Sequence, residues 1–213
     1  DLDVGGDFLD AFLLAPNRVA LVVGDVSGKG LAAAASTSEV KYTLRALLRE
    51  YQDPAMALTR LSVHLLQSRG LESAPSGFLA LALIVVDTAA GEATFAVGGM
   101  EAPLVVGRNQ VVRQVEIGGL PLGVLPYARY VSTMERLGPG DLLVITTDGI
   151  VEARRGQDFF GHEGLAETVA AARHIPALNE IADCILNTAS RFAGGELRDD
   201  TAILLARLRD CNG

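Results

Sequence analysis

The stretch from Val22 to Gly30 constrains the fold more than any other part of this sequence, because an apolar strand there meets a carboxylate and then several glycines. Residues 18–23 predict a buried β-strand, and Gly28 and Gly30 provide the backbone freedom for a sharp turn into a helix. Asp25 is therefore expected at the strand's end, where a side chain is held rigidly and still reaches solvent. Such a position suits a metal ligand.

Three more aspartates, Asp7, Asp148 and Asp199, stand beside strand-like runs. Taken singly, an aspartate next to glycine most often belongs to a turn. Taken together, four converging aspartates would provide carboxylates for two hard divalent cations, with a backbone carbonyl near Asp25 as a further ligand. Such cations activate water and neutralise phosphoryl charge, so the chemistry requires no Ser, Cys or His nucleophile. We therefore predict that the chain folds so that these four aspartates meet.

The apolar periodicity predicts a mixed α+β fold. Consecutive short strands joined by tight turns indicate antiparallel pairing, and helical patterns occur in two pairs. We expect two mostly antiparallel sheets, each flanked by a helix pair, in a four-layer α/β/β/α sandwich. The predicted strands are 8–14, 18–23, 78–86, 93–98, 104–106, 111–115, 130–137, 142–146 and 202–208, and the predicted helices are 31–51, 54–69, 163–172 and 176–193.

Length and charge limit the function classes. A chain of 213 residues suits one domain. Its 26 acidic and 18 basic side chains give a net charge of −8, which argues against nucleic acid as the main partner. The longest apolar run, 78–86, is shorter than the roughly 17 residues of a membrane span, so we expect a cytoplasmic domain. The sequence starts abruptly inside a motif, which suggests a fragment that lacks an upstream regulatory region.

Four motifs, read together, carry a family resemblance. Residues 4–10 (VGGDFLD), 24–30 (GDVSGKG), 147–153 (TDGIVEA) and 199–201 (DDT) occur in that order. They closely resemble the motifs of the metal-dependent protein phosphatases (PPM, or protein phosphatase 2C-like), in the bacterial SpoIIE/RsbU branch. Secondary matches are GLPLG, starting at Gly119, and Phe160-Gly161. The resemblance covers essentially residues 1–213 as a single phosphatase domain.

The resemblance implies a phosphoserine/phosphothreonine protein phosphatase with two Mn²⁺ or Mg²⁺ ions. By match to the family pattern, Asp25 would bridge the two ions, and Asp25 and Asp148 would be the catalytic residues. Asp148 and Asp199 would complete the shell of one ion, while Asp7 and the carbonyl of Val26 would serve the other. A metal-activated water would attack phosphorus in line, without a phosphoenzyme.

Four further residues lie in or next to the motifs. Asp10 and Asp200 either support the metal ligands or have a hydrogen-bonded structural role, and Gly149 stands directly after Asp148. Lys29 either steers phosphate or is simply solvated. The segment 24–30 is one residue short of P-loop spacing and has no Ser or Thr after the lysine, so it does not predict nucleotide binding.

Partners follow from the resemblance as well. Members of this branch typically dephosphorylate a small STAS-type anti-sigma-factor antagonist, in the partner switching that frees a sigma factor during stress responses or development. An upstream sensory domain usually controls them, and the full-length protein could be tethered to a membrane there. The sequence is compatible with a dimer. The helices from Leu31 to Arg69 resemble the family's regulatory switch, so their packing is expected to set whether Asp7 and Asp25 hold metal.

One departure and two alternatives stay open. Where relatives commonly carry a Gly-His-x-Pro turn, this chain has Met100-Glu101, which puts substrate contacts in doubt. The first alternative is a catalytically weak or inactive PPM-fold scaffold, against which the presence of all four aspartates counts. The second is a different two-metal hydrolase that acts on small phosphoesters or nucleotides; an acidic chain without tryptophan makes nucleic-acid cleavage its weaker form.

Overall fold

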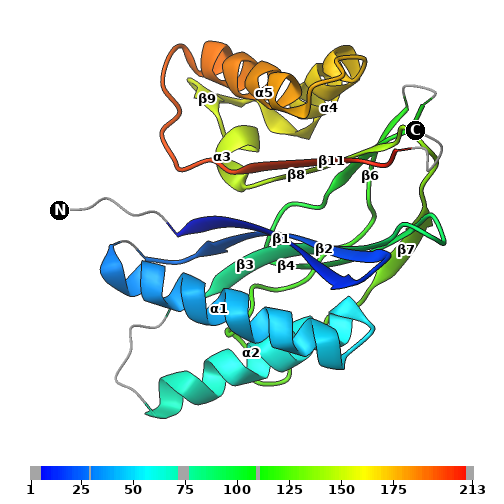
Figure 1. Ribbon diagram of the computed structural model, residues 1–213. Helices are drawn as coiled ribbons and strands as arrows, with labels where there is room; N and C mark the ends of the chain where they lie inside the picture. Colours follow the sequence, from blue (N-terminus) through cyan, green and yellow to red (C-terminus); the bar gives the residue numbers. More distant parts are fainter. Residues whose placement is uncertain (1–5, 29, 72–76, 109–110, 210–213) are drawn as a thin grey trace. The chain divides into compact units, whose positions relative to one another are not determined.

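The computed structural model describes residues 6–28, 30–71, 77–108 and 111–209, which form two compact units (Figure 1). Unit 1 comprises residues 1–102 and 116–136, and unit 2 comprises residues 103–115 and 137–213. Each unit contains one antiparallel sheet of four or five strands and one pair of long helices, and unit 2 also contains a two-stranded hairpin. The predicted α+β class, with two mostly antiparallel sheets and two helix pairs, is confirmed.

The sheet of unit 1 has five strands in the order β1-β2-β3-β4-β7, all antiparallel. They are β1 (Asp7–Ala15), β2 (Arg18–Val26), β3 (Leu79–Asp87), β4 (Glu92–Gly98) and β7 (Thr133–Arg136). Every residue from Leu79 to Val86 is buried, as the unbroken apolar run predicts.

The β1–β2 hairpin was predicted correctly, but the end of its second strand was not. β2 continues to Val26, so Asp25 lies inside the ladder instead of beyond it. Asp25 pairs with Asp7 on one side and with Ala80 on the other. Pairing with two neighbours keeps Gly24 and the residues after it extended, and this tertiary constraint outweighs the local turn signal.

Helices α1 (Leu31–Glu50) and α2 (Pro54–Leu71) cover one face of this sheet. The side chain of Asp53 accepts a hydrogen bond of 3.0 Å from the N–H of Ala55, as expected for a helix N-cap. No helix in the described part of the chain is long and apolar enough to cross a membrane. The core of the unit joins helix side chains to sheet side chains, among them Phe8, Val22, Leu44, Leu48, Leu58, Leu61, Leu81 and Leu83.

The sheet of unit 2 has four strands in the order β11-β8-β5-β6. They are β5 (Leu104–Val106), β6 (Val112–Gln114), β8 (Leu142–Thr146) and β11 (Ile203–Arg207). Helices α4 (Gly161–Ala172) and α5 (Leu178–Ala193) pack on it. The short α3 (Asp148–Val151) and the hairpin of β9 (Arg154–Arg155) and β10 (Asp158–Phe159) were not predicted.

Replacing Leu61 by alanine tests the packing of α2. Leu61 is fully buried in the core of unit 1, so Leu61→Ala should lower the free energy of unfolding by about 2–5 kcal/mol. Urea denaturation followed by circular dichroism measures the change. Leu13→Ala is the matched control, because Leu13 is 64% exposed and should change stability by no more than about 0.5 kcal/mol. Equal losses in both variants would contradict the packing described.

Candidate metal centre

Unit 1 places two of the predicted metal ligands directly opposite each other. Asp7, the first residue of β1, pairs with Asp25 of β2. Directly opposed residues of an antiparallel ladder have Cβ atoms about 4.5–5.5 Å apart on the same face of the sheet. Like charges in this arrangement repel, and a cation held between two carboxylates offsets that repulsion. Both side chains are partly exposed, so ions from solvent can reach them.

Gly6 brings the backbone close to the same carboxylate. The N–H of Val26 donates a hydrogen bond of 3.1 Å to the carbonyl of Gly6. A Cβ at Gly6 would collide with the carbonyl oxygen of Val26 and stand 2.6 Å from Oδ1 of Asp25. These two oxygens therefore face one point beside Gly6. A carbonyl and a carboxylate converging in this way form the hard-oxygen donor set that Mg²⁺ and Mn²⁺ prefer, so the residues of unit 1 fit the predicted ions.

Unit 2 brings the other two predicted ligands onto neighbouring segments. Asp148 begins α3 directly after β8, and the ladder between β8 and β11 continues beyond the strands through Thr147 and Ala202. The N–H of Thr147 donates to the carbonyl of Ala202 at 3.0 Å, and the N–H of Ala202 donates to Oγ1 of Thr147 at 2.8 Å. Thr147 is fully buried and locks the two segments together.

Gly149 and Asp200 take part in this junction. A Cβ at Gly149 would collide with the carbonyl oxygen of Asp200 and stand 2.8 Å from Cγ2 of Thr201. The glycine thus permits the close approach of the segment that carries Asp199. Oδ1 of Asp199 accepts a hydrogen bond of 3.0 Å from the N–H of Asp200. The side chains of Asp148 and Asp199 are exposed.

The four predicted ligands are thus divided two and two between the units. Taken over the described residues, neither unit holds a group of three or more His, Cys, Asp or Glu side chains that could bind a metal ion by itself. That the two pairs share cations stays a prediction. Lys29, the remaining motif residue, lies outside the described residues.

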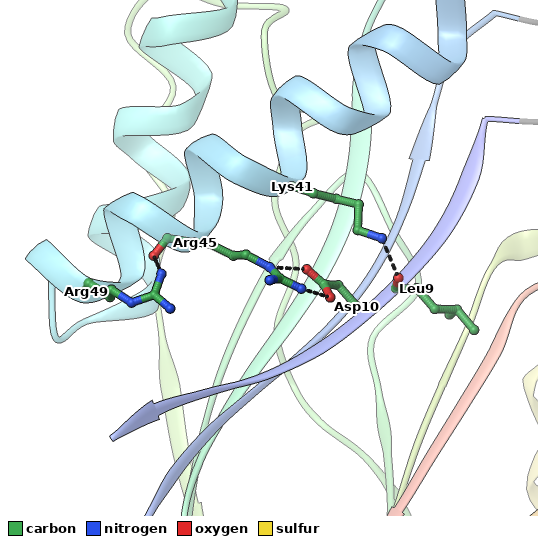
Figure 2. Close-up of polar contacts among 5 residues, drawn as sticks. All are labelled: Leu9, Asp10, Lys41, Arg45 and Arg49. Carbon is green, nitrogen blue, oxygen red and sulfur yellow. Dashed lines mark hydrogen bonds and ion pairs between the residues drawn. The ribbon is translucent and has the colours of Figure 1, made fainter. Parts of the chain in front are cut away.

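Asp10 contacts helix α1. Its carboxylate accepts hydrogen bonds from Arg45, at 2.8 Å from Nε and 2.6 Å from an Nη (Figure 2). One turn earlier on α1, Nζ of Lys41 donates to the carbonyl of Leu9 at 3.1 Å. Burial tends to raise the pKa of Asp10, but the hydrogen bonds and charge of Arg45, aided by Lys41, outweigh it and lower the pKa below its ordinary value. Asp10 therefore ties α1 to the strand that begins at Asp7.

Sequence reasoning missed this ion pair and a pocket in unit 2. The pocket has a volume of about 220 Å³ and lies beside Gly149 and Asp199. Its charged lining residues are Glu152, Arg154, Glu196, Arg198 and Asp199. The guanidinium of Arg154 stacks over the ring of Phe159, 4.3 Å from its centroid, and so supports the β9–β10 hairpin at the pocket's edge. The turn residue Gly156 was the only local signal for this hairpin.

The pair between Asp10 and Arg45 predicts an acid sensitivity. Because the folded state lowers the pKa of Asp10 below its ordinary value of 3.8, the stabilisation is present above pH 4 and is lost as the pH falls through the folded pKa. Asp10→Asn should lower the urea midpoint at pH 7 and flatten its decline between about pH 5 and pH 3. Asp183→Asn, on the exposed surface of α5, controls for loss of one charge. If the urea midpoint of Asp10→Asn declines between about pH 5 and pH 3 as steeply as that of the native chain, this account is wrong.

Comparison with known proteins agrees with the motifs. The family model for stage II sporulation protein E (SpoIIE) matches residues 15–209. Protein IcfG of Synechocystis is 26% identical over 97% of this chain and 36% of its own length. Phosphoserine phosphatase RsbU of Bacillus subtilis is 23% identical over 96% of this chain and 59% of its own length. The chain thus spans less than two thirds of the length of each of these relatives.

Solved structures share the fold. The RsbU and RsbW domains of a Mycobacterium tuberculosis protein match with a TM-score of 0.80 and 28% identity, over 98% of this chain and 56% of theirs. RsbX, solved in complex with magnesium, matches with a TM-score of 0.66 and 15% identity, over 96% of this chain and 88% of its own. The resemblance to the SpoIIE/RsbU branch is confirmed. The family model spans most of the length of this chain, which therefore belongs to the SpoIIE family.

Proposed function

We propose that this chain is a metal-dependent phosphoserine/phosphothreonine protein phosphatase, in which units 1 and 2 act as one catalytic domain. The observation that carries the proposal is the convergence of oxygen ligands at Gly6, where the carboxylate of Asp25 and the carbonyl of Val26 face one point. Family membership supports it, and so does the relative RsbU, which is named a phosphoserine phosphatase.

The proposed ligands of two Mn²⁺ or Mg²⁺ ions are Asp7, Asp25, the carbonyl of Val26, Asp148 and Asp199. When bound, two such ions supply Lewis acidity and charge neutralisation for the hydrolysis of a phosphate ester. The chain's own contribution is rigidity. Asp25 is fixed in a ladder with strands on both sides, and buried Thr147 fixes the segment that carries Asp148. Rigid ligands keep the site in its productive geometry.

The proposed substrate is the phosphorylated form of a STAS-type anti-sigma-factor antagonist, a cytoplasmic protein that takes part in partner switching. The support is membership in the SpoIIE family and similarity to RsbU and to the RsbU domain from Mycobacterium tuberculosis. The acidic charge of the chain is compatible with a phosphorylated substrate because bound cations reverse the local field.

Asp148→Asn tests the proposed catalytic role. Manganese-dependent hydrolysis of an aryl phosphate and of a phosphoserine protein should fall at least about 10–100-fold, the range seen even for groups that only support a metal ligand. Asp183→Asn makes the same substitution on the exposed surface of α5 and should retain full activity. An Asp148→Asn variant as active as the native chain would refute the proposed site. A native chain inactive on both substrates would favour a non-catalytic scaffold.

We also propose that the helices from Leu31 to Arg69 regulate this site. The support is the contact of α1 with β1, where Arg45 binds Asp10 and Lys41 binds the carbonyl of Leu9. Asp10 lies three positions after Asp7 on the same strand, so a shift of α1 pulls on the strand that presents this carboxylate. Regulation would then act through metal affinity.

Arg45→Ala tests this coupling. The variant should weaken Mn²⁺ binding about 10-fold, as loss of a group that supports a ligand does, with a smaller effect on turnover at saturating metal. Titration calorimetry measures the affinity independently of activity. Arg49→Ala is the matched control, because Arg49 donates to the carbonyl of Arg45 within its own helix. If Arg45→Ala binds Mn²⁺ as tightly as Arg49→Ala does, α1 does not position the ligands through this pair.

A further inference from the structure

The connection between β6 and β7, residues 115–132, contains no helix or named strand. Connections longer than about 12–15 residues are uncommon in compact domains and are usually functional or disordered. Within it, residues 119–131 form a segment that we call the apolar loop. Arg129 is its only charged residue. Its exposed large apolar side chains are Leu120, Val124, Leu125, Tyr127 and Val131, with Tyr127 92% exposed.

The apolar loop is anchored to the sheet of unit 1. Leu122 and Leu79 exchange two backbone hydrogen bonds, of 2.8 and 3.2 Å. The N–H of Gly99, in the turn after β4, donates to the carbonyl of Gly119 at 2.7 Å. This turn includes Met100 and Glu101, so the departure from the family pattern lies next to the loop.

The apolar loop also donates hydrogen bonds to two side chains of helix α2. The N–H of Gly123 donates to Oγ of Ser62 at 3.0 Å, and Ser62 is buried. The N–H of Tyr130 donates to Oγ1 of Thr59 at 3.4 Å, while the hydroxyl of Tyr130 donates to the carbonyl of Pro121 at 3.3 Å. The loop thus presents its exposed apolar side chains from a fixed backbone, which lowers the entropy lost when a partner binds.

The apolar loop borders the proposed metal ligands of unit 1. Leu79 pairs with Val26 on one side and with Leu122 on the other. Neighbouring strands lie about 4.7–4.9 Å apart, so Leu122 is roughly 10 Å from Val26 across the sheet. Asp25 precedes Val26 directly. Because successive side chains of a strand point to opposite faces of the sheet, the Asp25 side chain lies on the face opposite the one where Val26 and Leu122 pack with α1 and α2. A protein bound to the loop would therefore lie close to the strand end that carries these ligands.

We propose that the apolar loop docks the folded phosphoprotein substrate beside the catalytic site. The inference rests on the proposed phosphatase function and adds what the enzyme recognises: an apolar patch on a folded protein, next to its phosphoserine. A set of exposed apolar side chains that includes a tyrosine has the composition of a protein interface. Because the loop is almost uncharged, it binds through apolar contacts that the chain's net charge of −8 does not oppose.

Three substrates and two loop variants test the docking surface. The variants are Tyr127→Ala and the double variant Val124→Ser with Leu125→Ser, all at exposed positions. The substrates are a serine-phosphorylated STAS-domain protein, the peptide that spans its phosphoserine, and an aryl phosphate. Both variants should lose about 10-fold or more in kcat/KM on the folded phosphoprotein, as truncation of interface anchors does, and nothing on the two small substrates. Leu13→Ser, at the far end of β1 from Asp7, should match the native chain on all three.

Other results would overturn the proposal. Unchanged kinetics on the folded phosphoprotein would show that the loop does not bind it, and equal losses on all three substrates would show damage to the site. A shift in sedimentation of the loop variants alone would show that the loop joins two copies of the chain. Calorimetry separates this proposal from the proposed function, because it measures binding of the phosphoprotein independently of turnover. If the phosphoprotein binds in a way that depends on the loop, but no substrate is turned over, only the phosphatase assignment is refuted. Aryl phosphate turnover without phosphoprotein binding would refute docking only.

Discussion

The antiparallel ladder that sets Asp7 opposite Asp25 is the constraint on which the rest of this molecule depends. A slip of one residue would move every side chain of a strand to the opposite face of the sheet. The register also aligns Val26 with Leu79, and through Leu79 with Leu122. One pattern of backbone hydrogen bonds therefore fixes two carboxylates, the carbonyl of Val26 and the loop that borders them. The alternation of buried and exposed residues along β1 specifies this register.

Much of this architecture could be predicted because burial leaves a periodic pattern in the sequence. The apolar run of β3 indicated a strand buried on both faces, and Ile181, Ile185 and Ala189 mark the buried side of α5. The aspartates were recognisable because each adjoins a strand-like run and most have a glycine beside them. Close backbone approach explains two of these glycines, since Gly6 and Gly149 each face a carbonyl of a neighbouring segment.

The features that were missed depend on contacts between distant positions. The extension of β2 through Val26 is enforced by pairing with β1 and β3, against a local glycine signal. Arg45 and Asp10 are 35 positions apart, and a charged residue on a helix predicts solvent exposure by default. The β9–β10 hairpin has strands of two residues, too short to show alternation. The anchoring of the apolar loop was equally hidden, because Ser62 reads as an ordinary helix residue.

The hydrogen bonds that the apolar loop donates to Ser62 and Thr59 have a thermodynamic consequence. Both residues lie on α2, so this helix cannot rotate about its axis without breaking the hydrogen bonds that hold Gly123 and Tyr130. Two orientations of α2 would thus differ in their affinity for whatever binds the loop. Linkage requires the reverse effect with the same free energy: a ligand that prefers the anchored loop must itself favour the anchored orientation of α2. Binding of a protein to the loop and a regulatory change in the orientation of α2 would then each shift the equilibrium of the other.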